Sequence, residues 1–559
     1  MRRLFFIAAS AAALATVAVP ATAAPQRLAP SNSYVVLYDD ATSLASARLA
    51  VRASGGFLVT ENRRVGVATA TSSSPTFAAD LLRQGTVAGV ARNKPVGYNA
   101  PAQRRKSAER LTAAERASVR TLKAAAAAPA ADPLAGMQWD MAMIHATPSG
   151  SYGVQQGDRG VLVGVLDTGI DGTHPDIAAN FDAALSRNFT VDVPLVDGPC
   201  AAEADGSCND PANVDENGHG THVAGTIASP LNGLGMAGVA PNVRLVNLRA
   251  GQDSGYFFLQ ASVDALTFAG DHGVDIVNMS YFIDPWLYNC TGNPADSATA
   301  QLEQRTIIEA TTRALDYARS KGVTLIAAAG NEHTDMDHPT VDTISPDFPP
   351  GAAYTRAVDN SCLTMPTEGP NVVSVGAVGP STTKADYSNW GAEGVDVTAP
   401  GGYFRDLLGT PAHRTPATQI LGPYPLNVAQ DEGTLNPDGT PNTPFVVRDC
   451  QGGTCAYYQL IQGTSMASPH AVGVAALIVS QYGHPDPQRG GLELLPHQTE
   501  KILARTATPH ACPTPPVLDY TNVGRPASYT ATCIGTAEEN TIWGAGIVDA
   551  LTAVTDRNG

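Results

Sequence analysis

Basic residues are scarce in this chain. Its 559 residues include 35 Lys and Arg against 52 Asp and Glu, which gives a formal net charge of −17 at pH 7. This balance argues against general binding to nucleic acid. The charge is also uneven, because the part up to Asp132 carries about +10 and the remainder about −27. This asymmetry indicates two parts that attract each other, with solubility alone as the other explanation of the acidic body.

Long apolar runs are missing after the first residues, so we expect no stable membrane anchor. The first segment, "MRRLFFIAASAAALATVAVPATAA", has Arg2 and Arg3, a short Ala-rich apolar stretch and an Ala-Thr-Ala cleavage pattern ending at Ala23. This pattern is typical of a secretory signal peptide, here residues 1–23, and predicts a secreted protein. No Cys lies near the expected cleavage site, which excludes the simplest lipoprotein attachment.

Cysteine is absent from the first 199 residues, and no two cysteines have the C-x2-C spacing of a zinc site. The chain has eight cysteines, an even number that favours disulfides in an exported protein. They are Cys200, Cys208, Cys290, Cys362, Cys450, Cys455, Cys512 and Cys533.

The sequence divides into a small front domain, a linker and a large body. Residues 33–98 combine strand patterns such as "SYVVLYDD" with the helical "FAADLLRQG". An Ala-rich, basic and Pro-punctuated linker follows. From about Leu134, continuous apolar strands such as "GVLVGVLD" and "VTLIAAAGN" alternate with helical segments. This alternation predicts an α/β fold whose parallel sheet is covered by helices on both faces, preceded by a small α+β domain.

Polar, Gly- or Pro-rich stretches interrupt the large body at residues 193–213, 284–300 and 402–458. We interpret them as surface loops or small insertions. The chain contains no internal repeat.

Polar residues end three of the apolar runs, where parallel sheets bind their ligands. Asp167, Ser280 and Asn331 follow strand-like segments, and His219 begins the segment "HGTHVAGTIAS". Each has an ordinary reading as a turn or cap residue. Ser465 begins a helix that is apolar all round, and alone it would be a helix cap. Together, a hydroxyl, an imidazole and a carboxylate supply an activated nucleophile, and the Asn331 amide supplies an oxyanion donor.

The motifs "VLDTGIDGTHPD", "HGTHVAGTIAS", "AAAGNE" and "GTSMASPHAVG" resemble those of the subtilisin family of serine peptidases and occur in its order. The resemblance covers residues from about 135 to 555. It implies that Asp167, His219 and Ser465 are the catalytic triad and that Asn331 lies in the oxyanion hole. No cofactor is then required for the chemistry.

The same resemblance implies two walls of a substrate cleft. They are Ser254, Gly255 and Tyr256 on one side and Ser280, Tyr281 and Phe282 on the other. A peptide would bind between them as an added strand. Phe282 departs from the family, which usually has Gly at this position, and we expect its ring to reshape the primary specificity pocket. An insertion, "IDPWLYNC", follows it.

Asp176 and Asn232 match two ligand positions of a family calcium site, so structural calcium is possible. The alternative is that Asp176 only caps a turn. For the disulfides we predict pairs of sequence neighbours: Cys200–Cys208, Cys290–Cys362, Cys450–Cys455 and Cys512–Cys533.

The resemblance implies a serine endopeptidase that acts on peptide or protein substrates and is made as a zymogen, and the signal pattern predicts that it is secreted. The segment at about 33–98 resembles the family's inhibitory propeptide. The resemblance therefore implies a propeptide over residues 24–132 that acts as an intramolecular inhibitor, and a catalytic domain over residues 133–559. Self-cleavage is expected between Lys123 and Leu134. The alternatives are a restricted exo- or processing peptidase and a catalytically dead binding scaffold.

Overall fold

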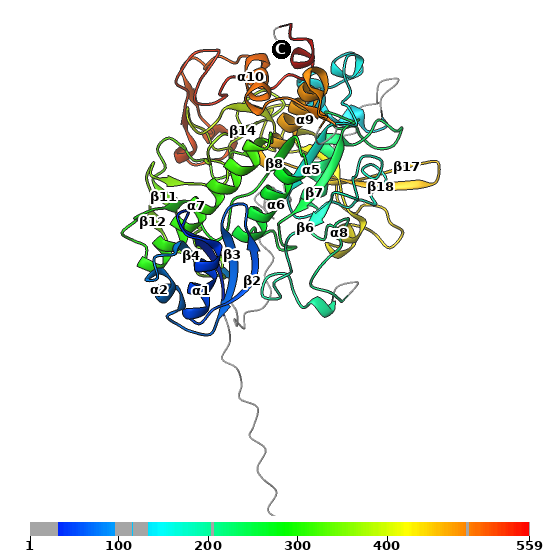
Figure 1. The fold of residues 1–559 in the computed structure, drawn as a ribbon. Coiled ribbons are helices and arrows are strands. Elements are labelled where there is room, and N and C mark those ends of the chain that lie inside the picture. The colour runs from blue at the N-terminus through cyan, green and yellow to red at the C-terminus, as the bar shows by residue number, and fades with distance from the viewer. Residues whose placement is uncertain (1–31, 95–114, 116–131, 203–205, 488–490, 558–559) are drawn as a thin grey trace, which may run out of the picture.

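The computed structural model describes residues 32–94, 115, 132–202, 206–487 and 491–557 (Figure 1). The expected signal peptide and all of the Ala-rich linker except Glu115 lie outside these residues.

A seven-stranded parallel sheet forms the centre of the larger part of the molecule. Neighbouring strands run parallel throughout, as the continuous apolar runs predict. In spatial order the strands are β15 (Val397–Pro400), β14 (Val372–Val378), β10 (Thr324–Ala328), β8 (Ile276–Met279), β5 (Leu162–Leu166), β7 (Arg244–Arg249) and β6 (Arg187–Asn188).

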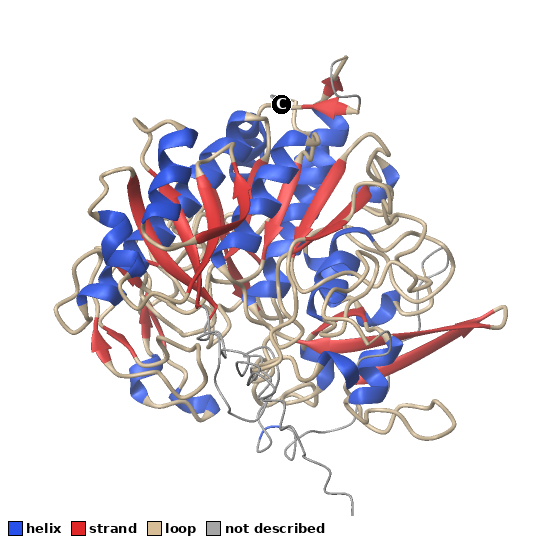
Figure 2. Ribbon diagram, turned by 60° about the horizontal axis from the view of Figure 1, so that its bottom comes forward, coloured by secondary structure: helices blue, strands red, loops and turns tan. Residues whose placement is uncertain are grey.

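Helices cover both faces of this sheet (Figure 2). Because side chains alternate along a strand, Val163 and Val165 of β5 join the core beneath α5 (His219–Ala228) and α9 (Thr464–Tyr482). Leu162 and Leu166 join the core on the other face, beneath α6 (Leu259–Asp271) and α7 (Ala298–Ser320). Both cores are fully enclosed, which confirms the predicted α/β class.

The front domain is a four-stranded antiparallel sheet with two helices on one face. The strands, in spatial order, are β2 (Phe57–Asn62), β3 (Val67–Ser72), β1 (Asn32–Tyr38) and β4 (Val87–Lys94), and the helices are α1 (Leu44–Ala53) and α2 (Phe77–Leu82). Tyr34 and Val36 pack under these helices, whereas Val35 and Leu37 face the other way and pack in the core of α6 and α7. The front domain therefore lies against the large body (Figure 1).

Residues 402–458 form more than a surface insertion. They contain η4 (Pro416–Thr418), α8 (Leu426–Asp431) and most of a sheet with the order β16 (Ile420–Pro423), β18 (Thr454–Ile461), β17 (Val446–Gln451). Strand β16 is buried against α5, and a Cβ atom on its Gly422 would lie 2.4 Å from the ring of His222. The Gly- and Pro-rich composition hid this strand, in which Gly422 is needed for the close approach to His222.

The remaining elements are short. They are η1 (Ala135–Met137), α4 (Trp139–Met143), η2 (Ser151–Gly153), η3 (Cys200–Ala202), β9 (Asn289–Cys290), β11 (Val341–Asp342), β12 (Arg356–Ala357), β13 (Cys362–Leu363), β19 (His484–Pro485), β20 (Leu492–Glu493), α10 (Pro496–Thr506), β21 (Val517–Leu518), η5 (Thr521–Val523), η6 (Ala527–Tyr529), β22 (Ala531–Thr532) and α11 (Ala550–Thr555).

Four disulfides join neighbouring cysteines along the chain: Cys200–Cys208, Cys290–Cys362, Cys450–Cys455 and Cys512–Cys533. These are the pairs that the sequence analysis predicts. Among the described residues, no helix has both the length and the hydropathy needed to cross a membrane.

Candidate active site

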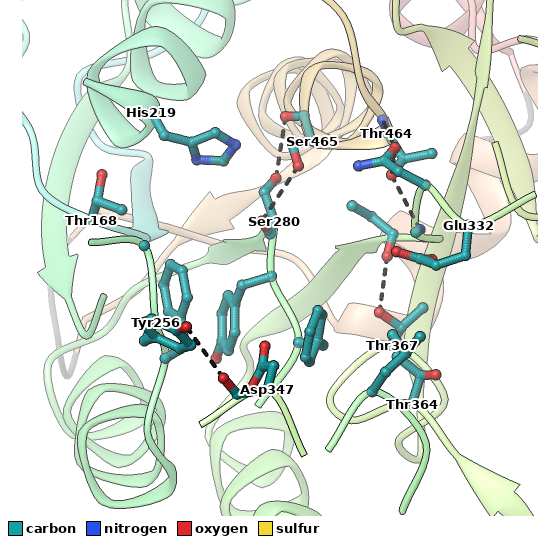
Figure 3. A pocket seen from close by; sticks show the side chains of 18 of the residues that line it. Thr168, His219, Tyr256, Ser280, Glu332, Asp347, Thr364, Thr367, Thr464 and Ser465 are labelled. Carbon is teal, nitrogen blue, oxygen red and sulfur yellow. Dashed lines mark hydrogen bonds between the residues drawn. The ribbon is translucent and has the colours of Figure 1, made fainter. Parts of the chain in front are cut away.

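Asp167 and His219 meet at the carboxyl end of the central sheet. Asp167 follows the last residue of β5 and is fully buried, and His219 is the first residue of α5. The Nδ1 atom of His219 lies 2.7 Å from Oδ1 of Asp167. Because a carboxylate accepts, Nδ1 carries the proton, and Nε2 is the basic nitrogen on the other side of the ring. The ring points toward Ser465 (Figure 3).

Asp215, which the sequence analysis missed, holds this pair in place. Its buried carboxylate accepts hydrogen bonds from the N–H of Gly218 at 2.9 Å and from the N–H and hydroxyl of Thr221 at 3.0 and 2.6 Å. It also accepts from the hydroxyl of Thr168, the neighbour of Asp167, at 3.2 Å. Burial raises the pKa of Asp215. The sequence signal was an Asp four residues before His219, because its carboxylate can accept hydrogen bonds from the first N–H groups of a helix, which have no partner within the helix.

Ser465 lies in the first turn of α9 and is buried. Its Oγ lies 3.4 Å from the carbonyl oxygen of Ser280, and the hydroxyl of Ser280 donates to the carbonyl of Ser465 at 3.2 Å. Asn278 connects the two elements further, because it donates to Ser280 Oγ and accepts from the hydroxyl of Ser468. Strand β8 and helix α9 thus fix the position of Ser465, and the positive end of the helix dipole lies beside it.

Asn331 is oriented by the residue before Ser465. Its Oδ1 accepts from the N–H and from the hydroxyl of Thr464, each at 2.9 Å. The N–H of Gly330 donates in turn to the Thr464 hydroxyl at 3.1 Å. These contacts assign the amide oxygen, so the donor nitrogen of Asn331 lies on the opposite side of the group. Sequence reasoning found Asn331 but not Thr464.

A pocket of about 350 Å³ brings these residues together. His219, Asn331 and Ser465 line it, and so do all six predicted cleft residues: Ser254, Gly255, Tyr256, Ser280, Tyr281 and Phe282. The ring of Phe282 also packs against the apolar cluster around Leu287 and Tyr288, within the predicted insertion. A hydroxyl beside an imidazole, an oriented amide donor and an adjoining pocket form a constellation suited to acyl transfer.

The two predicted calcium ligands contact each other directly. Asn232 Nδ2 donates to Oδ1 of Asp176 at 3.0 Å, and the N–H of Met236 and the hydroxyl of Tyr458 donate to Oδ2, each at 3.1 Å. The Oδ1 of Asn232 accepts from the N–H of Leu234. Protein donors therefore surround the oxygens that calcium would need, and this arrangement does not fit the ion. Burial raises the pKa of Asp176 to about 8.

A cluster of three acidic residues surrounds a guanidinium group. Asp192, Asp210 and Asp253 are buried, and their carboxylate oxygens lie within 4.8 Å of one another. Arg249 donates to Asp210, to Asp192 at 3.4 Å and to Asp253 at 2.7 Å. Burial raises the pKa of Asp253 to about 8, and the charge of Arg249 opposes that rise. The cluster is a buried ion-pair network whose cation is Arg249.

Comparison with known proteins identifies relatives. A sequence model of the Subtilase family matches residues 158–546. Subtilisin DY of Bacillus licheniformis is 29% identical over 329 residues, which are 58% of this chain and 80% of the relative. The thermophilic serine proteinase of Bacillus sp. (strain AK1) is 30% identical over 382 residues, which are 68% of this chain and 64% of the relative.

Solved structures share the fold. An epidermin leader peptide processing serine protease from Staphylococcus aureus superposes with a TM-score of 0.59 and 20% identity, covering 95% of this chain and 99% of that protein. Fervidolysin of Fervidobacterium pennivorans gives a TM-score of 0.52 and 21% identity, covering 94% of this chain and 61% of that protein.

Proposed function

This chain belongs to the subtilase family of serine peptidases, and we propose that it hydrolyses peptide bonds with Asp167, His219 and Ser465. The observation that carries the proposal is the short contact between His219 Nδ1 and Asp167 Oδ1, with Ser465 and Asn331 lining the same pocket as His219.

The reaction follows from these positions. Nε2 of His219 takes the proton of the Ser465 hydroxyl as Oγ attacks the peptide carbonyl, and Asp167 stabilises the imidazolium that forms. Asn331 donates to the developing oxyanion. The imidazolium then protonates the leaving amine, which departs and leaves an acyl-serine. Water, deprotonated by His219, hydrolyses this ester and restores the Ser465 hydroxyl. Side chains of this chain and water supply every group that takes part in the reaction.

Active-site labelling tests the triad separately from substrate choice. An organophosphonate should form a covalent bond to Ser465 and block casein hydrolysis, with the modified peptide identified by mass spectrometry. Ser465→Ala should abolish both labelling and hydrolysis. Ser480→Ala is the matched control on the same helix, since Ser480 Oγ donates to the Ala476 carbonyl away from the pocket. Absence of labelling in the wild type would support the dead-scaffold reading.

We propose endopeptidase action, with a processing peptidase as the second candidate. The observation that favours the second is the apolar packing of Phe282 on residues of the insertion after it, which places a wall beside the pocket. Casein and short blocked peptides separate the two, because a processing enzyme should cut few sites in casein.

We propose that the front domain inhibits the enzyme before maturation. Its sheet packs against α6 and α7 through Val35, Leu37 and Val67. Asn62 Nδ2 donates to Asp264 at 2.7 Å and to Thr267 at 2.6 Å. These contacts support a propeptide held on the catalytic domain, with the domain boundaries at 24–132 and 133–559.

We propose secretion for the mature enzyme. The four disulfides support it, because such bonds persist in oxidising compartments.

A further inference from the structure

The active-site pocket extends away from Ser465 into a region that we name the distal lobe. Its lining residues are Tyr256, Leu287, Ile344 and Asp347. Asp347 lies beside Tyr256, at the end of the pocket away from Ser465 (Figure 3). The Tyr256 hydroxyl donates to the backbone carbonyl of Asp347 at 3.3 Å.

Two segments build the distal lobe together. The N–H of Asp347 donates to the carbonyl of Pro285 at 3.0 Å, and the N–H of Leu287 donates to Oγ of Ser345 at 2.8 Å. The ring of Phe348 packs edge-on against Tyr256. These contacts hold the backbone on both sides of Asp347, which lines the pocket.

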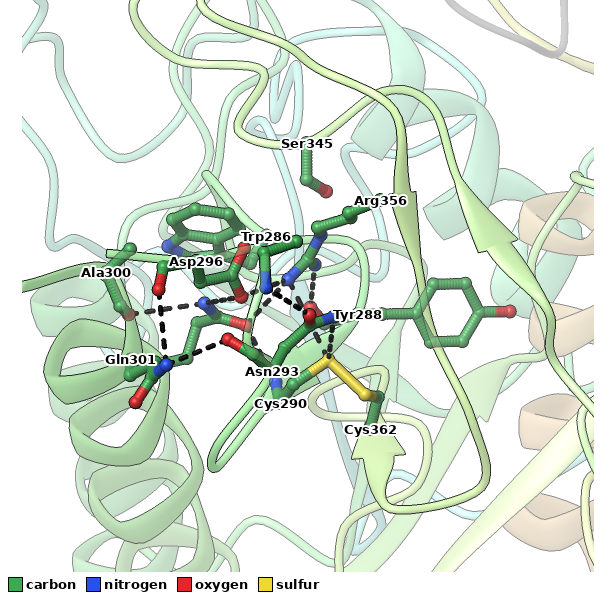
Figure 4. Close-up of polar contacts among 12 residues, drawn as sticks. Trp286, Tyr288, Cys290, Asn293, Asp296, Ala300, Gln301, Ser345, Arg356 and Cys362 are labelled. Carbon is green, nitrogen blue, oxygen red and sulfur yellow. Dashed lines mark hydrogen bonds and ion pairs between the residues drawn. A yellow bond between two sulfur atoms is a disulfide. The ribbon is translucent and has the colours of Figure 1, made fainter. Parts of the chain in front are cut away.

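Arg356 connects both segments (Figure 4). It is 1% exposed and donates to Asp342 at 2.8 Å, to Asp296 at 2.8 Å and to the carbonyl of Tyr288. Asp342 accepts in addition from the N–H groups of Ile344 and Ser345, each at 3.0 Å. The Cys290–Cys362 disulfide lies in the same cluster. This rigid support is what a specificity pocket requires.

The charged groups of the pocket are of one sign apart from His219. Among the described residues that line it, Glu332 and Asp347 carry carboxylates, and none is Lys or Arg. Glu332 is held by Asn389, which donates to its Oε2 at 2.9 Å. A cleft lined by one sign of charge concentrates ligands of the opposite sign.

The segment before the catalytic domain has the complementary charge. Residues 101–123 contain seven Lys and Arg against two Glu. If the enzyme cuts itself free after this segment, its first substrate is basic.

We propose that Asp347 determines specificity and selects substrates that place a Lys or Arg side chain in the distal lobe. This inference rests on the proposed peptidase function. The carboxylate pairs with the cation, and the ring of Tyr256 lies against the aliphatic stem of the same side chain.

Paired peptides test the inference. In fluorogenic peptides, one position at a time on the acyl side of the cut bond is Lys or its neutral isostere norleucine. At one position the wild type should show a kcat/KM ratio of about tenfold or more in favour of Lys. Asp347→Asn should reduce this ratio to below about threefold. Asp431→Asn, an exposed carboxylate on α8, is the control with the same charge change and should keep the ratio. Organophosphonate labelling and Tm show that each variant is folded.

The outcomes are distinct. Equal hydrolysis of both peptides by the wild type overturns the specificity of the distal lobe and leaves the peptidase function standing. Loss of the preference in Glu332→Gln with retention in Asp347→Asn assigns the selection to Glu332 and also overturns the inference. Failure of the wild type to cut any peptide overturns the proposed function and this inference with it.

Discussion

The Oδ1 atom of Asn331 lies 2.9 Å from both the backbone nitrogen and the hydroxyl of Thr464. The residue immediately before the proposed nucleophile thus orients the proposed oxyanion donor.

Thr464→Val should lower kcat by about tenfold with little change in KM, since one of the two hydrogen bonds that orient Asn331 is lost while the side-chain shape remains. Thr464→Ser keeps the hydroxyl and should stay close to the wild type. Steady-state kinetics on one peptide compare the three proteins. A rise in KM with kcat unchanged would contradict a positioning role for the Thr464 hydroxyl.

Asn331→Ala should have the larger effect, a loss of about 10²–10³-fold in kcat. This magnitude is that known for the corresponding donor of subtilisin, a member of the same family. The amide acts mainly on the charge that develops after attack, so KM should change little. A loss of tenfold or less would mean that Asn331 is not the donor.

The sequence predicted the strands of the central sheet because each is a local, recognisable pattern. Strand β5 and its neighbours are continuous apolar runs, and their ends located Asp167, Ser280 and Asn331 without any coordinates. Local motifs also located His219 and Ser465. Each of these residues is identified by what precedes or follows it in the chain.

Residues whose role depends on distant partners were not predictable. Tyr458 reaches Asp176 across 282 positions of sequence, and Arg356 joins Asp296 with Asp342. Asp347 lies in a Pro-rich stretch without periodicity, so nothing local places it in the pocket. The buried strand β16 could not be predicted either, because its Gly and Pro residues normally indicate a loop.

Chelation should leave the stability of the enzyme unchanged, because protein donors fill the positions around Asp176. In a Ser465→Ala background, which prevents self-digestion, excess EDTA should not shift Tm. Tyr458→Phe should lower Tm, since it removes a donor to a buried carboxylate, a loss of about 1–3 kcal/mol. A fall in Tm with EDTA that Asp176→Asn abolishes would show that calcium binds there after all.

Lys384 should make stability rise with pH between about 7 and 10.5. Burial lowers its pKa from 10.5 to about 7, and its ammonium group donates to the carbonyls of Ala385 and Ser388. In this window the unfolded chain binds more protons at Lys384 than the folded protein does, so the free energy of unfolding increases with pH.

Lys384→Met should remove this contribution to the slope. Urea titrations of the two proteins at pH 7, 8 and 9, again in the Ser465→Ala background, measure it. Lys501→Met, at an exposed site on α10, is the control and should retain the wild-type slope. Parallel slopes for wild type and Lys384→Met would contradict the shift.

Maturation depends on the proposed catalytic residues, because these residues are expected to cut the front domain from the catalytic domain. If Ser465 cuts the chain between Lys123 and Leu134, Ser465→Ala should accumulate as a longer precursor, and the wild type as a shorter form whose new N-terminus lies in that interval. The Ala- and Pro-rich composition there favours cleavage, since proteolysis concentrates in segments of this kind. N-terminal sequencing and intact mass measure the products in a host without other extracellular proteases.

Asn62→Ala tests the inhibitory part of the same proposal, because Asn62 donates from the front domain to Asp264 and Thr267 on α6. When the separated front domain is added back to mature enzyme, the variant should inhibit with a Ki about tenfold higher than the unaltered domain. Ser43→Ala, at the helix cap of α1 away from α6, controls for loss of folding, and circular dichroism checks both domains.

Normal maturation of Ser465→Ala would reject self-cleavage. Equal inhibition by the Asn62→Ala and unaltered domains would instead reject only the docking contact, because the cut and the inhibition depend on different residues.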